Sequence, residues 1–106
     1  MALTRGDVVL VAEGKPRPVV IIQSDSLPTP DAVLICPLTS FLIDAPIYRP
    51  TIGPSATNGL IVTSQLMLDR VTPARRTRID RAIGRLSDPD MERLALALIV
   101  LLDLVG

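Results

Sequence analysis

Arg17 stands between two prolines at the start of the β-branched run 19–22. Each proline fixes its own φ angle and pushes the residue before it into an extended conformation, so the arginine is carried on stiff backbone. A guanidinium held in this way can donate two parallel hydrogen bonds to a phosphate group. It can also form a structural ion pair with Asp7 or Asp25, and the residues alone favour this second interpretation.

Thr39 and Ser40 bring two hydroxyl groups to the end of another apolar run, "AVLICPLTS", at 32–40. A hydroxyl can donate a hydrogen bond to a phosphate oxygen, although at a strand end it is commonly satisfied by the backbone. The chain has no histidine, which removes the commonest metal ligand and the usual general base. Its one cysteine, Cys36, excludes an internal disulfide framework and a cysteine zinc site. We therefore expect no metal and no cofactor, and any catalysis must use Arg, Asp, Glu, Ser, Thr or Lys.

Arginine dominates the basic residues of this chain. Lys and Arg together count 11, as do Asp and Glu, so the formal net charge is zero and does not indicate nucleic-acid binding by the whole molecule. Six arginines nevertheless lie between Arg70 and Arg85, with Asp69 and Asp80 interleaved. Composition alone favours a solvated, charge-balanced face for this stretch, while a locally basic binding surface stays open.

The segments that position these residues are predicted to be β-strands over the first two thirds of the chain. Pro37 is expected to bring its strand to an edge or an end of the sheet. The pair Asn58-Gly59 is a strong turn signal. The region 72–86 is ambiguous between strand and other structure. The predicted strands are Asp7 to Ala12, Arg17 to Ser24, Ala32 to Ser40, a short one near Tyr48 to Ile52, and a main strand from Leu60 to Leu68.

The sequence of the last fifth of the chain indicates a helix that begins after Ser87. Ser87 is a good N-cap, and Pro89 lies in the first turn, where proline is tolerated. The run from Leu94 to Leu102 is apolar on nearly all sides. A terminal helix of so small a domain can hardly be enclosed by its own chain, so the surplus apolar face predicts a partner subunit.

At 106 residues and 48% hydrophobic composition, the chain is expected to fold as one domain over 1–106. The longest apolar run has nine residues, whereas a bilayer span needs about 20. The N-terminus lacks the apolar stretch of a signal peptide. We expect a cytoplasmic protein without membrane contact. The expected fold is mainly β with a C-terminal helix (α+β), a small barrel or strongly bent antiparallel sheet closed by helices.

Five segments resemble, in order, the motifs of the MazF/PemK family of type II toxin-antitoxin endoribonuclease toxins. "RGDVVLV" (5–11) resembles the opening strand of the family, "RPVVIIQSD" (17–25) its arginine-proline strand and "CPLTS" (36–40) its threonine motif. "GLIVTSQLMLDRVT" (59–72) and "IGRLSDPDMERLALAL" (83–98) complete the series. Each motif alone is weak, but five in order over nearly the whole chain are a good signal.

The resemblance implies an SH3-like barrel with added helices, assembled as a homodimer. It implies sequence-selective, metal-independent cleavage of single-stranded RNA, often messenger RNA, by attack of the RNA's own 2′-hydroxyl, which leaves 2′,3′-cyclic phosphate and 5′-hydroxyl ends. It also implies inhibition by a cognate antitoxin protein, with operator DNA bound only through the antitoxin complex. The alternative is a non-catalytic toxin of the same superfamily that binds and poisons a protein such as a topoisomerase. An SH3-like peptide adaptor ranks last, because two aromatic residues cannot line a peptide groove.

The same resemblance implies the site residues. Arg17 matches the catalytic arginine and Thr39 the catalytic threonine. Ser40 beside Thr39, and Asp69, the acid that follows the central strand, complete the expected catalytic residues. Many members carry Asp-Gln-x-Arg-Thr-x-Asp where this chain has "DRVTPARRTR", so the general base stays unassigned. Of the two aromatic residues, Phe41 is expected in the core, and Tyr48 stays open between base stacking and the core. The residues expected to bind RNA or an antitoxin are Arg5, Arg70, Arg75, Arg76, Arg78 and Tyr48.

Overall fold

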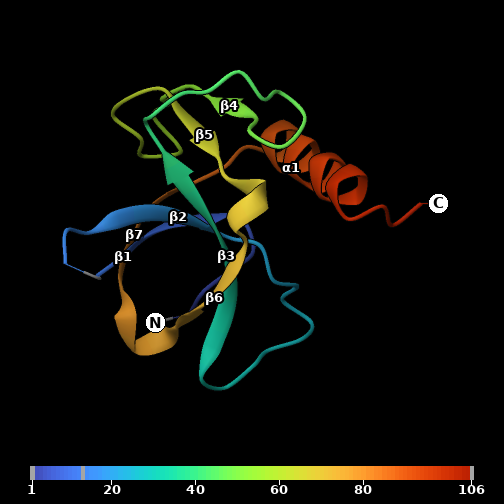
Figure 1. The fold of residues 1–106 in the computed structure, drawn as a ribbon. Coiled ribbons are helices and arrows are strands. Elements are labelled where there is room, and N and C mark those ends of the chain that lie inside the picture. Colours follow the sequence, from blue (N-terminus) through green and yellow to red (C-terminus); the bar gives the residue numbers. More distant parts are fainter. Residues whose placement is uncertain (1, 13, 106) are drawn as a thin grey trace.

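The computed structural model describes residues 2–12 and 14–105, which form a curled antiparallel sheet and one C-terminal α-helix. Two short 3₁₀ turns, η1 (Leu68–Arg70) and η2 (Arg76–Arg78), interrupt the second half of the sheet. Figure 1 shows α1 next to β4 and β5, in the upper part of the view. The remaining elements are β1 (Asp7–Val11), β2 (Arg17–Ile21), β3 (Ala32–Thr39), β4 (Thr51–Ile52), β5 (Ser64–Leu66), β6 (Thr72–Arg75), β7 (Ile79–Arg85) and α1 (Asp88–Leu101).

The long strand β3 connects the two lobes of the sheet. One lobe contains β1, β2, β6 and β7, and the other contains β4 and β5. The strands follow the order β4-β5-β3-β2-β1-β7, and every pairing is antiparallel. The first half of β3 pairs with β6, and its last two residues, Leu38 and Thr39, pair with β5. β3 therefore runs through both lobes, as Figure 1 shows. The expectation of a mainly β fold with a strongly bent antiparallel sheet and a C-terminal helix is confirmed.

Pro37 lies inside β3, so the prediction that it marks an edge or an end of the strand is wrong. It stands opposite Val19 of β2, and its carbonyl accepts a hydrogen bond from the Met67 N–H at 2.9 Å. The N–H and C=O of a strand residue point toward the same neighbour, so the missing N–H of Pro37 falls on the Met67 side. There β3 leaves β6 and joins β5, and the Met67 carbonyl accepts a hydrogen bond from the Arg70 N–H at 2.9 Å in place of one from Pro37.

The β-branched run of β2 is buried on both faces of the sheet, as an unbroken apolar strand requires. Val19 and Ile21 pack into one cluster, together with Ile35 of β3. Val20 faces the other cluster, which contains Leu94 of α1. Both faces of β2 are thus fixed by packing, which makes the start of this strand a firm base for Arg17.

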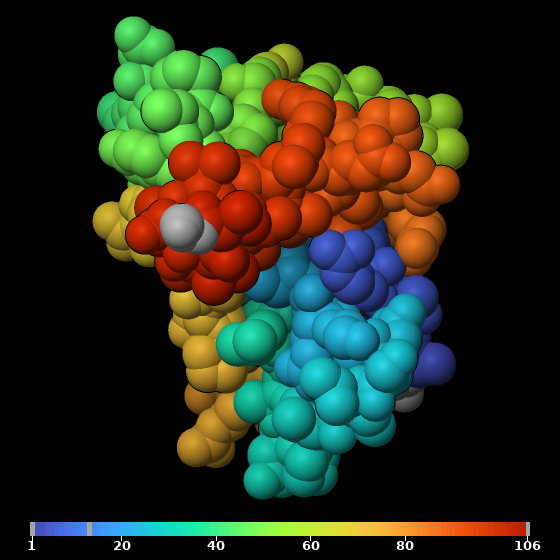
Figure 2. All heavy atoms as spheres, turned by 90° about the vertical axis from the view of Figure 1, so that its right-hand side faces the viewer, coloured from blue at the N-terminus to red at the C-terminus, as the bar shows by residue number. Residues whose placement is uncertain are grey.

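The helix begins where the capping residues predict. The Asp90 N–H donates to the Ser87 hydroxyl at 3.2 Å, and Pro89 lies in the first turn. Met91, Leu94 and Ala97 are buried against the sheet. Figure 2 shows the C-terminal part of α1 and the residues after it on the surface of the molecule. Large apolar side chains exposed there are Leu96, Val100, Leu101, Leu102, Leu104 and Val105. No helix in the described part of the chain is long and apolar enough to cross a membrane.

The predicted main strand from Leu60 to Leu68 is much shorter in the structure, where β5 covers only Ser64–Leu66. The side chain of Asn58 is the physical reason. Its amide donates to the Gly53 carbonyl at 2.9 Å, and its oxygen accepts from the N–H groups of Ser55 and Leu60, each at 3.0 Å. The Asn58-Gly59 pair therefore organises a wide loop, and the chain enters the sheet only four residues after Leu60.

Candidate active site at the end of the central strand

Arg17 and Thr39 lie together because of the register between β2 and β3. Ile21 pairs with Ile35 and Val19 with Pro37. Continued by two residues, this register places Arg17 opposite Thr39, on the same face of the sheet. Side chains directly opposite in an antiparallel pair have Cβ atoms about 5 Å apart. The arginine-proline strand and the threonine motif thus meet at one point.

Two surface hollows share this point. The first, of about 200 Å³, is floored by core residues and bordered by Thr72 and Pro73 of β6. The second, of about 450 Å³, is bordered by Lys15, Ser40 and the loop 59–62. Arg17, Leu38 and Thr39 line both hollows. These three residues therefore form a ridge between the two hollows.

The guanidinium of Arg17 has no partner among the described acidic residues. Both acids proposed as alternative partners are occupied elsewhere. Asp7 forms an ion pair with Arg85 at 3.1 Å, and Asp25 accepts a hydrogen bond from the Arg5 backbone N–H at 2.8 Å. The interpretation of Arg17 as a structural ion pair with Asp7 or Asp25 is therefore wrong. Arg17 is exposed and lines both hollows, so the N–H donors of its guanidinium are open to a ligand.

Thr39 and Ser40 present hydroxyl groups beside this charge. The Thr39 hydroxyl oxygen accepts a hydrogen bond from the Phe41 N–H at 3.1 Å. This contact fixes the oxygen while its own O–H remains a donor for a further partner. Ser40 is exposed at the border of the second hollow. The site therefore presents a cation and donor hydroxyls, a combination suited to an anionic oxygen.

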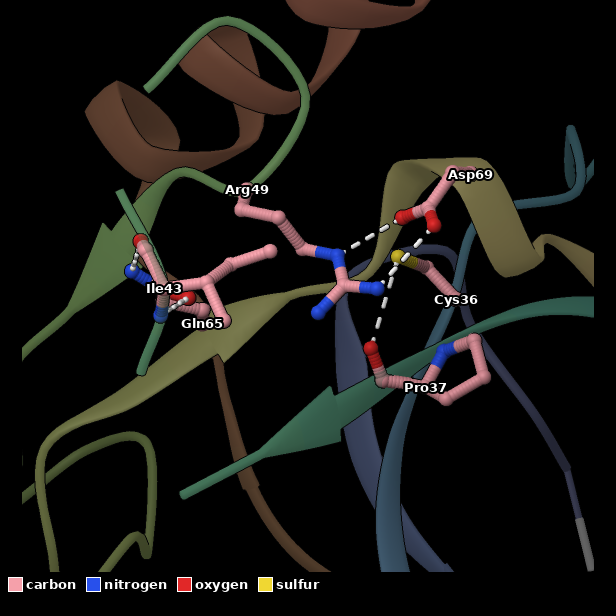
Figure 3. Close-up of polar contacts among 6 residues, drawn as sticks. All are labelled: Cys36, Pro37, Ile43, Arg49, Gln65 and Asp69. Carbon is pink, nitrogen blue, oxygen red and sulfur yellow. Dashed lines mark hydrogen bonds and ion pairs between the residues drawn. The ribbon is translucent and has the colours of Figure 1, made fainter. Parts of the chain in front are cut away.

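Asp69 lies outside both hollows and is bound to Arg49. The Nε and Nη2 of Arg49 donate to the two carboxylate oxygens at 2.7 and 3.0 Å. Figure 3 shows Arg49 reaching from the loop before β4 to Asp69 on η1, near the Cys36 thiol. The hydrogen bonds from Arg49 hold the pKa of Asp69 below its usual value. Asp69 thus holds the loop before β4 in place through Arg49, and it does not line the two hollows at Arg17 and Thr39.

The Arg49–Asp69 pair predicts a pH dependence of stability. Because the folded pKa of Asp69 is lowered, its contribution is present above the unfolded value near 4 and is lost as pH falls through the folded pKa. We expect the Asp69→Asn variant to be less stable than the wild type at pH 6. Their unfolding free energies should converge as pH falls toward 3, measured by urea denaturation. A difference that stays constant over this range would contradict the contribution of the pair.

Cys36 is fully buried under the same pair. Burial is the main cause that raises the pKa of its thiol to about 12. The reactive thiolate is therefore scarce near neutral pH. We expect Cys36 to resist a thiol reagent such as DTNB in the folded protein and to react within minutes in 6 M guanidinium chloride. Fast stoichiometric labelling of the folded protein would contradict this burial.

The predicted RNA- or antitoxin-binding residues have different environments. Two of them hold loops: the Nε of Arg5 donates to the Ile22 carbonyl at 3.2 Å, and that of Arg76 donates to the Thr29 carbonyl at 2.8 Å. None of the six lines the two hollows. The others are exposed at the surface: Arg70, Arg75, Arg78 and, with 36% exposure, Tyr48.

Sequence reasoning missed several residues that shape the site. Phe41, expected in the core, is 77% exposed, so that prediction is wrong. Gln65 is buried and forms two hydrogen bonds to the Ile43 backbone, at 3.0 and 2.9 Å. A glutamine directly before the apolar residues of "SQLML" was the available signal for such a role. Lys15 and Thr72 border the hollows, but nothing in the sequence around them indicates this position.

The described residues contain no group of three or more His, Cys, Asp or Glu that could hold a metal ion.

Solved structures share the fold of this chain. This chain aligns with "Mycobacterium tuberculosis toxin MazF-mt6" with a TM-score of 0.79 and 23% identity, over 92% of this chain and 96% of that one. It aligns with "Endoribonuclease in complex with its cognate antitoxin from Mycobacterial species" with a TM-score of 0.82 and 20% identity, over 99% of both chains. These likenesses establish the fold.

Sequence similarity establishes the family. Residues 4–102 match the family described as PemK-like, MazF-like toxin of type II toxin-antitoxin system. The chain is also 39% identical to the "Probable endoribonuclease MazF" of Mycolicibacterium smegmatis, over 98% of this chain and 100% of that protein. The chain belongs to the PemK/MazF toxin family, as its five motifs predicted.

Proposed function

We propose that this chain is an endoribonuclease toxin that cleaves single-stranded RNA without a metal ion, through the 2′-hydroxyl of the RNA. The observation that carries the proposal is that Arg17 and Thr39 both line the two hollows, where no described carboxylate neutralises the guanidinium. The 39% identical relative is itself named a probable endoribonuclease, which supports the same activity here.

The reaction needs charge stabilisation more than it needs a strong nucleophile from the protein. The 2′-oxygen loses its proton, forms a bond to phosphorus and displaces the 5′-oxygen, which takes up a proton as it leaves. Negative charge grows on the non-bridging oxygens during this step. Arg17 can donate two hydrogen bonds to these oxygens, and the Thr39 hydroxyl can donate a third. We propose that Ser40, which borders the second hollow, binds the neighbouring phosphate.

Asp69 acts in this scheme as a positioning residue. Both of its oxygens are engaged by Arg49, and its lowered pKa makes it a weak base. The described residues that line the hollows carry hydroxyls and cations, with no carboxylate among them. We therefore assign the main catalytic contribution of the protein to stabilisation of the developing anion.

The proposal includes two protein partners. The surplus apolar surface on α1 and the residues after it supports a homodimer, because a monomer rarely leaves so many large apolar side chains in water. A relative of the same fold is named in complex with its cognate antitoxin, and we propose such an inhibitor for this chain. Arg70, Arg75 and Arg78 are candidate contacts for RNA or an acidic antitoxin segment. Operator DNA would be bound only through that complex, and we propose action in the cytoplasm.

The proposal is tested with purified protein, a long single-stranded RNA and excess EDTA. We expect cuts at a short recurring sequence, with 5′-hydroxyl ends that polynucleotide kinase labels directly, and no cuts in DNA of the same sequence. A folded protein that leaves the RNA intact would refute the nuclease and would favour a toxin that binds a protein target. Cutting that requires added Mg²⁺ would refute the mechanism.

A further inference from the structure

Phe41 is an exposed aromatic ring attached to the site itself. It follows Thr39 by two residues, and its backbone N–H donates to the Thr39 hydroxyl at 3.1 Å. Two residues of chain span at most about 7 Å, so the Cα of Phe41 lies within the length of one extended nucleotide from the Thr39 Cα. Its side chain is 77% exposed, in a chain that contains one phenylalanine, one tyrosine and no tryptophan.

The segment that carries Phe41 is fastened on both sides of the ring. On one side is the Thr39 hydroxyl. On the other, the buried side-chain amide of Gln65 accepts from the Ile43 N–H and donates to the Ile43 carbonyl, as a strand neighbour would. Figure 3 shows this amide against the Ile43 backbone, with Arg49 fixing the far end of the loop to Asp69. The ring is therefore presented to water by an ordered backbone, which limits the entropy lost when a ligand binds it.

Phe41 follows Ser40, which borders the second hollow, and the residues that line this hollow are of two kinds. Arg17, Thr39 and Lys15 provide charge and donors. Beside them Ile61 and Val62 border the second hollow with 92% and 49% exposure, and Leu42 is 49% exposed. The cationic and hydrogen-bond-donating side chains suit a phosphate, and the apolar side chains suit the face of a base. Base stacking on an aromatic side chain is the main way in which proteins bind unpaired bases.

We propose that Phe41 stacks on the base of the nucleotide that flanks the cleaved phosphate, and that it contributes to RNA affinity and to the choice of cleavage sequence. This inference rests on the proposed function and names a substrate contact of the same site. Phe41 thereby anchors the base while Arg17 and Thr39 bind the phosphate. Because stacking acts on substrate binding, its loss should raise KM far more than it lowers kcat.

A fluorescence experiment tests the contact without relying on turnover. The Phe41→Trp variant has a single tryptophan, since the natural chain has none. The probe is an RNA oligonucleotide of the mapped cleavage sequence with one 2′-deoxyribose at the cut position, so that it binds and is not cut. We expect strong quenching of the emission on binding. Phe41→Ala should bind the probe about 5- to 150-fold more weakly than the wild type, the range that corresponds to one lost stack.

Leu27→Ala is the matched control, because Leu27 is also an exposed apolar residue (69%) but borders a different hollow, beside Thr29 and Asp31. Its affinity and cleavage should equal those of the wild type. The inference is overturned if the wild type cuts RNA while Phe41→Ala keeps full affinity and Phe41→Trp shows no quenching; the nuclease proposal would then stand. Quenching by an antitoxin-derived peptide but not by the RNA probe would also overturn it. A wild type that cuts no RNA refutes the proposed function itself.

Discussion

Arg17→Ala is expected to lower the rate of RNA cleavage about 10²- to 10³-fold, with no change in fold. The guanidinium has no described acidic partner, so its removal breaks no ion pair, and Arg17 is exposed. Unfolding free energy should therefore change by less than about 0.5 kcal/mol. The loss should appear in kcat, because the hydrogen bonds strengthen only as charge develops on the phosphate. Single-turnover cleavage at saturating protein measures it.

Two further variants test whether the donor geometry of Arg17 matters beyond its positive charge, and whether loss of another exposed arginine has the same effect. Arg17→Lys keeps the positive charge and loses the planar pair of donors, so we expect an intermediate rate. Arg81→Ala removes an exposed arginine whose nearest acid, Asp80, lies 3.6 Å away, and it should cut at the wild-type rate. A folded Arg17→Ala protein that retains wild-type cleavage would remove the basis for placing the reaction at this ridge.

Gly84→Ala is expected to destabilise the protein strongly. A Cβ at this position would lie 2.3 and 2.5 Å from the backbone carbon and oxygen of Asn58, atoms that cannot rotate away. The loop before β5 crosses β7 here, and the Arg85 N–H donates to the Thr57 carbonyl at 2.8 Å. Displacing the loop breaks this contact and overpacks the crossing, which costs about 1–3 kcal/mol or more. Urea denaturation with circular dichroism measures the loss.

Gly53→Ala provides the control for this prediction. No atom lies within 4 Å of a Cβ built at Gly53, so alanine should be neutral or stabilise the protein by about 0.4–1 kcal/mol. Gly84→Ala should in addition reduce RNA cleavage, because the crossing loop continues into Ile61 and Val62 at the second hollow. Equal stabilities of the two variants would show that β7 and the loop separate easily.

The elements with strong local signals were predictable from the sequence. Strands β1, β2 and β3 begin at Asp7, Arg17 and Ala32, as predicted, because continuous apolar runs bounded by turn residues specify them. The helix follows the Ser87 cap. β7 was ambiguous because its side chains do not alternate between buried and exposed. Its position depends on pairing with β1, which is distant in the sequence.

The errors have a common physical origin in contacts between distant residues. The partner of Asp69 is Arg49, which lies 20 positions away, and no local pattern connects them. Phe41 was assigned to the core from its apolar character alone, whereas its exposure results from a backbone fixed by Thr39 and Gln65. Arg17 and Thr39 were identified through the family motifs, but their juxtaposition follows only from strand register.

The most direct test of the account is cleavage of one RNA oligonucleotide in which a single 2′-hydroxyl, at the nucleotide before the mapped cut, is replaced by hydrogen. The proposed reaction uses that oxygen as its nucleophile, and the hollows hold no described carboxylate to activate water in its place. We expect the wild-type protein, in EDTA, to cut the all-ribose oligonucleotide and to leave the substituted one intact while still binding it. Cleavage of the substituted oligonucleotide at the same bond would show that water attacks the phosphate, and would contradict the mechanism assigned to Arg17 and Thr39.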